Sequence, residues 1–225
     1  QVSRNPDGGG WVSAAWLSTM PEYRRMFGSQ ALARDVRLAV RAVAILFTDL
    51  TGSAALYHEH GDASAFRLVH EHFGLLEGII EQFGGARVKS IGDALMVAFF
   101  DPTAAVDCAL AMQEHFQAWA QGLEMAHPPG LKVGLHFGSA MAVHSDQAGL
   151  DYFGGTVNLA ARCEGRSERH CVIWTEAVQR APGVAERVAR WGGDVEAFEA
   201  EVKGIPGPMR LYRARVGPVT VGEKG

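Results

Sequence analysis

Two acidic residues stand where short apolar segments of the sequence end. Asp49 follows the apolar run 42–47, and Asp93 lies between the apolar segments 86–91 and 94–100. If these segments are neighbouring strands of one sheet, both carboxylates project from the same edge. Paired carboxylates on rigid strand ends suit Mg²⁺, which is often bound by one or two carboxylates together with substrate phosphate oxygens. The residues alone leave open that Asp49 caps a helix and that Asp93 only forms a turn.

A segment suited to binding phosphate follows the first of these acids. Thr51, Gly52 and Ser53 stand at the expected start of a helix. Free backbone N–H groups and the helix dipole favour an anion at such a position. A metal site beside a phosphate-binding turn indicates nucleotide chemistry.

A second polar group lies later in the chain. Asn158 and Arg162 are four residues apart, so they share one face of the helix predicted there. An amide beside a guanidinium fits recognition of ribose and phosphate, because Arg is a strong donor to developing negative charge. On the residues alone, the pair could equally be a solvated surface pair, and Lys89 could equally be a surface lysine.

Apolar periodicity predicts the elements that would position these residues. A long amphipathic helix is expected over 66–83, ended by Gly84-Gly85. Strands 86–91 and 94–100 are separated only by Gly92-Asp93, which predicts a tight hairpin. Asp101-Pro102-Thr103 then starts a second helix that runs to about Leu123.

The second half of the chain predicts further strands and one more helix. We expect a second hairpin around Gly138-Ser139, with strands 131–137 and 140–144. A helix over 156–164 and a strand over 171–175 follow. The remaining strands are expected at about 184–191, 198–201 and 210–216. The order β-α-β-β-α-β predicts an α+β fold with a ferredoxin-like core, a mainly antiparallel sheet with helices on one side, and added C-terminal strands.

Composition limits the classes of function. The chain has 225 residues, 21 Lys and Arg, and 25 Asp and Glu, for a net charge of −4. Since no cluster of basic residues stands out, we expect neither a nucleic-acid partner nor membrane contact by this segment. The longest apolar run, 94–100, is far shorter than the roughly 18 residues of a spanning helix. Three unpatterned cysteines, Cys108, Cys163 and Cys171, predict free thiols and a cytoplasmic location.

Three segments together resemble the signature blocks of the class III nucleotidyl cyclases. They are Phe-Thr-Asp-Leu-Thr-Gly-Ser at 47–53, Val-Lys-Ser-Ile-Gly-Asp at 88–93 and Gly-Gly-Thr-Val-Asn-Leu-Ala-Ala-Arg at 154–162. They occur in the order and at the separations usual in that family. Lys-Gly-Ile-Pro-Gly-Pro at 203–208, with Leu-Tyr-Arg at 211–213, resembles the closing strand of the family.

The resemblance implies a two-metal mechanism. Asp49 and Asp93 would hold two Mg²⁺ or Mn²⁺ ions, with the backbone carbonyl of Leu50 as a further ligand. The ions would activate the ribose 3′-hydroxyl and bind the triphosphate. Arg162 would stabilise charge on the α-phosphate, and Asn158 would orient the ribose.

The resemblance also assigns the choice of base. Lys89 would donate to adenine N1, and Asp151 would accept from the adenine amino group, so the implied enzyme is an adenylate cyclase that makes 3′,5′-cyclic AMP and pyrophosphate from ATP. Lys203 is the candidate phosphate-binding lysine, unless it only caps a strand. The alternatives are a guanylate or dual-specificity cyclase, and a catalytically silent domain that dimerises or senses nucleotide.

The family's active sites lie between two chains. One chain supplies the two metal-binding aspartates, and the other supplies the four residues Lys89, Asp151, Asn158 and Arg162. Because this chain carries both sets, the resemblance implies a homodimer with two equivalent sites.

Domain limits follow from the same resemblance. The catalytic domain is expected over 39–217, after a linker with short helices at 1–38 and before a flexible tail at 218–225. The first residue is Gln, so we expect either a segment of a longer protein, with a regulatory region upstream, or a processed chain. The expected location is cytoplasmic, for the protein itself or for this domain of a larger protein. The nine histidines are interpreted as solvated or structural, with His70 and His72 on a polar helix face.

Overall fold

The computed structural model describes residues 3–4, 11–12, 37–123, 125–145 and 149–217. The expected linker lies outside the described residues except for two short strands, β1 (Ser3–Arg4) and β2 (Trp11–Val12), which pair with each other. The expected C-terminal tail also lies outside them.

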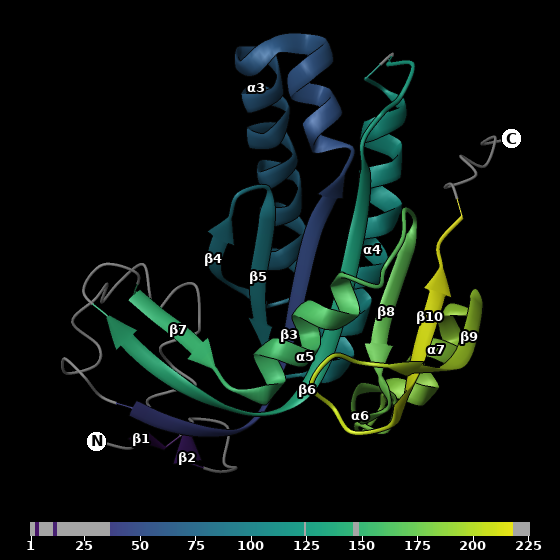
Figure 1. Ribbon diagram of the computed structural model, residues 1–225. Coiled ribbons are helices and arrows are strands. Elements are labelled where there is room, and N and C mark those ends of the chain that lie inside the picture. Colours follow the sequence, from purple (N-terminus) through teal and green to yellow (C-terminus); the bar gives the residue numbers. More distant parts are fainter. Residues whose placement is uncertain (1–2, 5–10, 13–36, 124, 146–148, 218–225) are drawn as a thin grey trace, which may run out of the picture.

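Eight strands of the described chain form one sheet (Figure 1). They are β3 (Arg37–Thr51), β4 (Ala86–Ile91), β5 (Ala94–Phe99), β6 (Gly130–Ser145), β7 (Gly149–Phe153), β8 (Cys171–Thr175), β9 (Asp194–Glu201) and β10 (Pro208–Arg215). Their order is β4-β5-β3-β6-β8-β10-β9, with β7 paired to the end of β6. Only β6 and β8 run parallel to each other. The prediction of an α+β fold with a mainly antiparallel sheet is confirmed.

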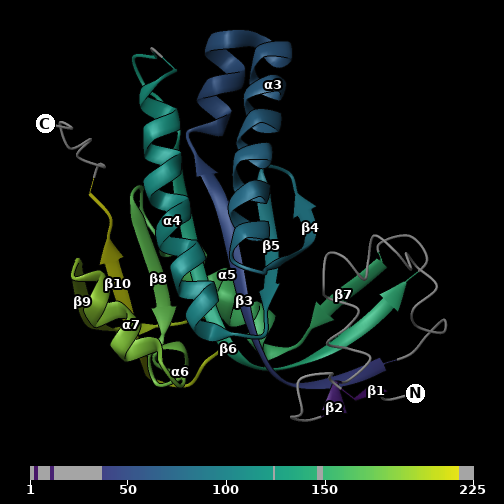
Figure 2. The same cartoon turned by 180° about the vertical axis from the view of Figure 1, so that it is seen from behind.

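Helices cover both faces of this sheet. They are α3 (Ser53–Gln82), α4 (Pro102–Gln121), α5 (Gly155–Glu164), α6 (Glu176–Gln179) and α7 (Val184–Trp191). The long helices α3 and α4 lie side by side on one face, as Figure 2 shows, whereas α5 lies on the opposite face in Figure 1. The expectation that helices lie on one side therefore holds for the long helices but not for α5.

Strand β3 is buried on both faces, because its consecutive apolar side chains point alternately to the two faces of the sheet. Ala44 and Leu46 belong to the core beneath α3 and α4, while Val43, Ile45 and Phe47 belong to the cluster on the side of α5. Packing on both sides fixes the position of the C-terminal end of β3, where the signature segment begins.

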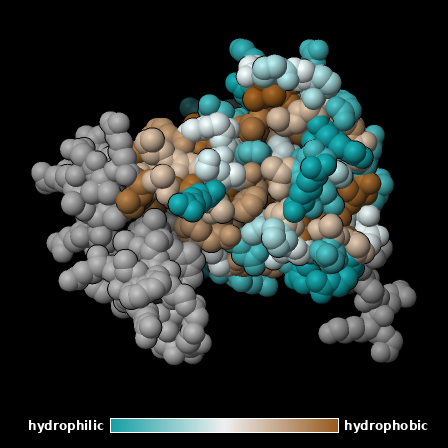
Figure 3. All heavy atoms as spheres, turned by 90° about the horizontal axis from the view of Figure 1, so that it is seen from below, coloured by the Kyte–Doolittle hydropathy of each residue, from teal (hydrophilic) through white to brown (hydrophobic). Residues whose placement is uncertain are grey.

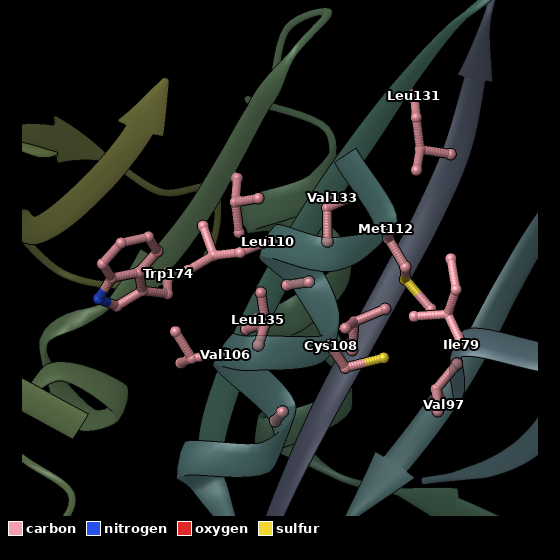
Figure 4. Packing of buried hydrophobic residues seen from close by; sticks show 14 of the residues in the cluster. Ile79, Val97, Val106, Cys108, Leu110, Met112, Leu131, Val133, Leu135 and Trp174 are labelled. Atoms are coloured by element: carbon pink, nitrogen blue, oxygen red, sulfur yellow. The ribbon is translucent and has the colours of Figure 1, made fainter. Parts of the chain in front are cut away.

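The larger core lies between the two long helices and the sheet. Figure 4 shows Cys108 and Met112 of α4 close to Ile79 of α3 and Val97 of β5, and Trp174 of β8 at the other end of the cluster. Trp174 is fully buried and stacks on Tyr212, with 6.2 Å between ring centroids. One core thus extends from the β4 side of the sheet to the β10 side.

The second predicted hairpin is wrong, because β6 is one continuous strand. It pairs with β3 from Arg37 to Thr51, with one irregularity between Val40 and Val43. A Cβ atom at Gly138 would lie 2.8 Å from the hydroxyl oxygen of Thr156 in α5. The glycine therefore marks a close approach of helix to strand and not a turn.

The strand predicted at 184–191 is also wrong, since this segment is helix α7. Val184 and Val188 are four residues apart and both buried, which is a helical spacing. Left-handed glycines, Gly183 with φ 81° and Gly192 with φ 72°, bound the helix on both sides.

The expected free thiols are confirmed for the described chain. Cys108, Cys163 and Cys171 are unpaired and buried. Burial raises the pKa of Cys163 to about 12, so its thiol stays protonated at neutral pH. None of the described helices combines the length and the apolar character needed to cross a membrane.

Candidate active site

The two aspartates of the signature segments lie at one edge of the sheet. Asp49 is near the end of β3, and Asp93 is in the turn between β4 and β5. The strands are joined there, because Thr48 pairs with Leu95 and its hydroxyl accepts the Leu95 N–H at 3.3 Å. One carboxylate oxygen of Asp93, Oδ2, is buried and has no hydrogen-bond partner among the described residues. A buried carboxylate oxygen without a donor is costly unless a cation or another donor binds it.

A lysine and a glutamate that sequence reasoning missed complete this acidic edge. Lys132 of β6 is the direct partner of Asp49 in the β3–β6 pairing. Its ammonium forms ion pairs with Asp49 Oδ2 and, at 2.8 Å, with Glu164 Oε1 at the end of α5. We name Asp49, Asp93, Lys132 and Glu164 the acidic edge.

The ionisation of the acidic edge follows from its burial and charges. Burial lowers the pKa of Lys132, but its close contacts with the carboxylates of Asp49 and Glu164 outweigh this effect and raise the pKa overall. Burial raises the pKa of Glu164 although Lys132 lowers it, and the nearby charges of Asp49 and Asp93 raise it further. Lys132 pairs with Asp49 and Glu164, and Asp93 adds a third carboxylate near Glu164. One ammonium therefore offsets only part of this negative charge, and the excess fits a divalent cation.

The described side chains alone do not complete a metal site. No group of three His, Cys, Asp or Glu residues in the described chain is arranged as a full set of ligands. Mg²⁺ commonly takes its remaining ligands from water and from substrate phosphates. Two aspartates at one sheet edge are consistent with such incomplete ligation by protein.

The turn after β3 leads into α3, whose N-terminus lacks a side-chain cap. Gly52 has φ 80°, a left-handed conformation that glycine adopts without strain, and no side-chain hydrogen bond caps this start of α3. Gly52 is exposed, while Thr51 and Ser53 are half-buried. The first backbone N–H groups of α3 are therefore available to an anion.

Lys89 and Asp151 are brought together from distant parts of the chain. The ammonium of Lys89 in β4 lies 2.7 Å from Asp151 Oδ2 in β7. It also lies 5.7 Å from the ring centroid of Phe153, whose side chain is 50% exposed. The backbone N–H of Tyr152 donates to Asp151 Oδ1 at 2.8 Å, which fixes the carboxylate.

Asn158 and Arg162 lie on α5, whose other side packs on the sheet. Asn158 is exposed and Arg162 half-buried. The guanidinium of Arg162 lies against Gly204, where a Cβ atom would be 3.2 Å from Nη1. The exposed turn that carries Lys203 before β10 therefore lies against Arg162 at Gly204.

One histidine is not where the sequence predicted it. His70 is exposed, but His72 is fully buried and packs against Phe73 and Phe116, with ring centroids 4.3 and 6.4 Å away. Burial lowers the pKa of His72 to about 4. The polar-face prediction is wrong for His72, because α3 turns this position towards α4.

Comparison with known proteins now connects these features to a family. The family described as "Adenylate and Guanylate cyclase catalytic domain" matches residues 38–212. A receptor-type adenylate cyclase of Trypanosoma congolense is 28% identical over 206 residues, covering 76% of this chain and 27% of the relative. The pH-sensitive adenylate cyclase MT1302 of Mycobacterium tuberculosis is 28% identical over 213 residues, covering 91% of this chain and 50% of the relative. The chain thus spans half or less of these relatives.

Solved structures share the fold. A Trypanosoma brucei adenylate cyclase studied in its monomeric state superposes with a TM-score of 0.68 at 26% identity, over 80% of this chain and 90% of that one. The guanylyl cyclase Cya2 superposes with a TM-score of 0.70 at 20% identity, over 84% and 98%. Since the family match covers most of the sequence and the fold agrees, the chain belongs to the adenylate and guanylate cyclase catalytic domain family.

Proposed function

We propose that the chain is an adenylate cyclase domain that converts ATP to 3′,5′-cyclic AMP and pyrophosphate. The observation that carries this proposal is the Lys89–Asp151 pair, a donor and an acceptor held 2.7 Å apart. Adenine offers an acceptor at N1 and a donor at its amino group, so it matches both side chains. The adenylate cyclases of Trypanosoma and Mycobacterium among the relatives support the same choice.

The acidic edge would hold the metal ions. Asp49, Asp93 and the Leu50 carbonyl are the proposed ligands, and the unpartnered Oδ2 of Asp93 supports this assignment. Two bound Mg²⁺ or Mn²⁺ ions would supply activation of the 3′-hydroxyl and neutralisation of the triphosphate.

The remaining residues bind and orient the nucleotide. The backbone N–H groups of the turn at 51–53 would receive phosphate oxygens, and Lys203 would add a positive charge there. Asn158 would hold the ribose so that its 3′-oxygen faces the α-phosphorus. That oxygen forms the new bond as the bond to the β-phosphate breaks, and Arg162 would stabilise the charge on the α-phosphate.

The proposed active form is a homodimer with two shared sites. Large apolar residues are exposed on the strands around the Lys89–Asp151 pair. They are Ile91, Met141 and Phe153, which are 53%, 45% and 50% exposed. Met141 and Phe153 are direct partners in the β6–β7 pairing. Figure 3 shows a broad apolar area across one side of the described surface. Such a surface is typical of an interface. A twofold arrangement would bring the acidic edge of one copy to Asn158 and Arg162 of the other.

The catalytic domain is proposed to span 39–217 of a longer protein. The receptor-type relatives are several times longer than the matching part, which supports a regulatory region outside this segment and a cytoplasmic place for the domain.

Product analysis tests the proposal. The protein is incubated with ATP or GTP and Mn²⁺ over a series of protein concentrations, and cyclic nucleotides are separated by chromatography. We expect cyclic AMP to form faster than cyclic GMP, with specific activity rising as protein concentration increases. Faster turnover of GTP would favour a guanylate cyclase, and no turnover at any concentration would favour a silent domain.

A further inference from the structure

We propose that Glu164 is a positioning residue: it gives Lys132 a second carboxylate partner, so that the ammonium can leave Asp49 to a divalent cation. This inference rests on the proposed metal-binding role of Asp49. It concerns a side chain that carries no role in the signature pattern, and it follows from the ion pairs of the acidic edge.

The ammonium of Lys132 occupies the place of a cation. Lys132 and Asp49 face each other across β3 and β6, so their side chains project from the same side of the sheet. The ammonium contacts Asp49 directly, and the two side chains are only 21% and 27% exposed. An ion pair with this little solvent competes with a metal ion for the same carboxylate.

Glu164 offers the ammonium a second carboxylate. It lies 2.8 Å from Lys132 Nζ and its side chain is 16% exposed. A metal ion at Asp49 repels the ammonium, which then requires another partner. Because the lysine stem has four flexible carbons, the ammonium can move to Glu164 without any change in the backbone.

The backbone around Glu164 is fixed by an unusually close contact. A Cβ atom at Gly134 of β6 would lie 1.9 Å from the backbone nitrogen of Glu164. Gly134 is two residues beyond Lys132 on the same strand face. The missing side chain lets the end of α5 rest on β6, and this contact places the glutamate beside the lysine.

Metal binding without nucleotide tests the inference. Mn²⁺ binding to the full chain is measured by electron paramagnetic resonance for the unmodified protein, Glu164→Gln, Lys132→Met and the double variant. Glu164→Gln should weaken Mn²⁺ binding about tenfold, since the ammonium then pairs only with Asp49. Lys132→Met should strengthen binding, because it removes the competing cation.

The double variant separates positioning from direct attraction. If Glu164 acts through Lys132, Glu164→Gln should have little effect once Lys132 is Met. An equal loss in both backgrounds would show that the glutamate attracts the metal directly and would overturn the inference, as would unchanged binding in Glu164→Gln. Glu168→Gln is the matched control, since Glu168 is an exposed residue shortly after α5 and its loss changes the net charge equally. Circular dichroism of each variant verifies folding.

Two further measurements distinguish a failure of this inference from a failure of the proposed function. Asp49→Asn should abolish Mn²⁺ binding; retained binding would overturn both the metal assignment and the role of Glu164. If Asp49→Asn loses binding but Glu164→Gln does not change it, only the inference about Glu164 fails. In turnover assays, Glu164→Gln should raise the Mg²⁺ concentration needed for half-maximal rate more than it lowers the rate at saturating Mg²⁺, a split that a general loss of structure would not produce.

Discussion

The ammonium of Lys89 lies 2.7 Å from the carboxylate of Asp151, although 62 residues separate them in the chain. The contact joins β4 to β7, two strands that are not paired with each other in the sheet. The two side chains therefore form one unit before any nucleotide binds, and changes to either should affect the choice of base.

Lys89→Ala should lower kcat/KM for ATP by about 10- to 100-fold, because a buried purine acceptor then lacks its donor. The value of kcat/KM for GTP should fall less, so the ratio of kcat/KM for ATP to that for GTP should decrease. Asp151→Asn tests the other half of the pair. Since the residues interact, the double variant should lose less than the product of the single effects. An unchanged ratio of ATP to GTP turnover in both single variants would contradict the assignment of base recognition.

Gly134→Ala should destabilise the fold strongly. Its Cβ atom would lie 1.9 Å from the backbone of Glu164, a clash that no flexible side chain can relieve. We expect the free energy of unfolding to fall by about 3 kcal/mol or more, measured by urea denaturation. Gly78→Ala in α3 is the matched control, because no atom lies within 4 Å of its Cβ position. It should stabilise the helix by up to about 1 kcal/mol, and similar values for both variants would contradict the packing of α5 on β6.

His136 should make stability depend on pH. Burial lowers its pKa to about 4, and it shares a hydrogen bond of 2.7 Å with the hydroxyl of Thr175. The unfolded chain takes up a proton below its ordinary pKa of about 6.5, whereas the folded chain does so only near 4. The contribution of His136 is therefore present above pH 6.5 and lost as the pH falls towards 4.

The measurement compares urea unfolding at pH 7 and pH 5 for the unmodified protein and His136→Gln. The unmodified protein should lose about 1–2 kcal/mol more than the variant over this interval. Equal losses would show that His136 is protonated in the folded state or that its burial is not retained in solution.

The sequence predicted the strands and helices that are regular and locally determined. The apolar run 42–47 and the Gly92-Asp93 turn were sufficient for the central strands and for the common edge of Asp49 and Asp93. Gly138 misled the prediction, because a glycine required by a close helix looks the same in sequence as a glycine required by a turn.

The parts that could not be predicted depend on contacts between distant segments. Lys132 meets Asp49 only through the β3–β6 register, and Glu164 reaches Lys132 only because α5 packs on Gly134. The burial of His72, in contrast, agrees with helical periodicity, because it lies three residues after Val69 and four before Leu76, both of which are buried. The polar character of histidine misled that prediction.

The proposed active site combines the acidic edge of one copy with Asn158 and Arg162 of the other. Complementation between two inactive variants tests it most directly: Asp93→Ala and Arg162→Ala are each assayed alone with ATP and Mn²⁺, and then after mixing in equal amounts. Each variant alone should be inactive, and random pairing should restore about a quarter of the unmodified activity, because half of the dimers then contain one intact site of two. No recovery in the mixture, while each variant still folds and dimerises, would contradict the shared site.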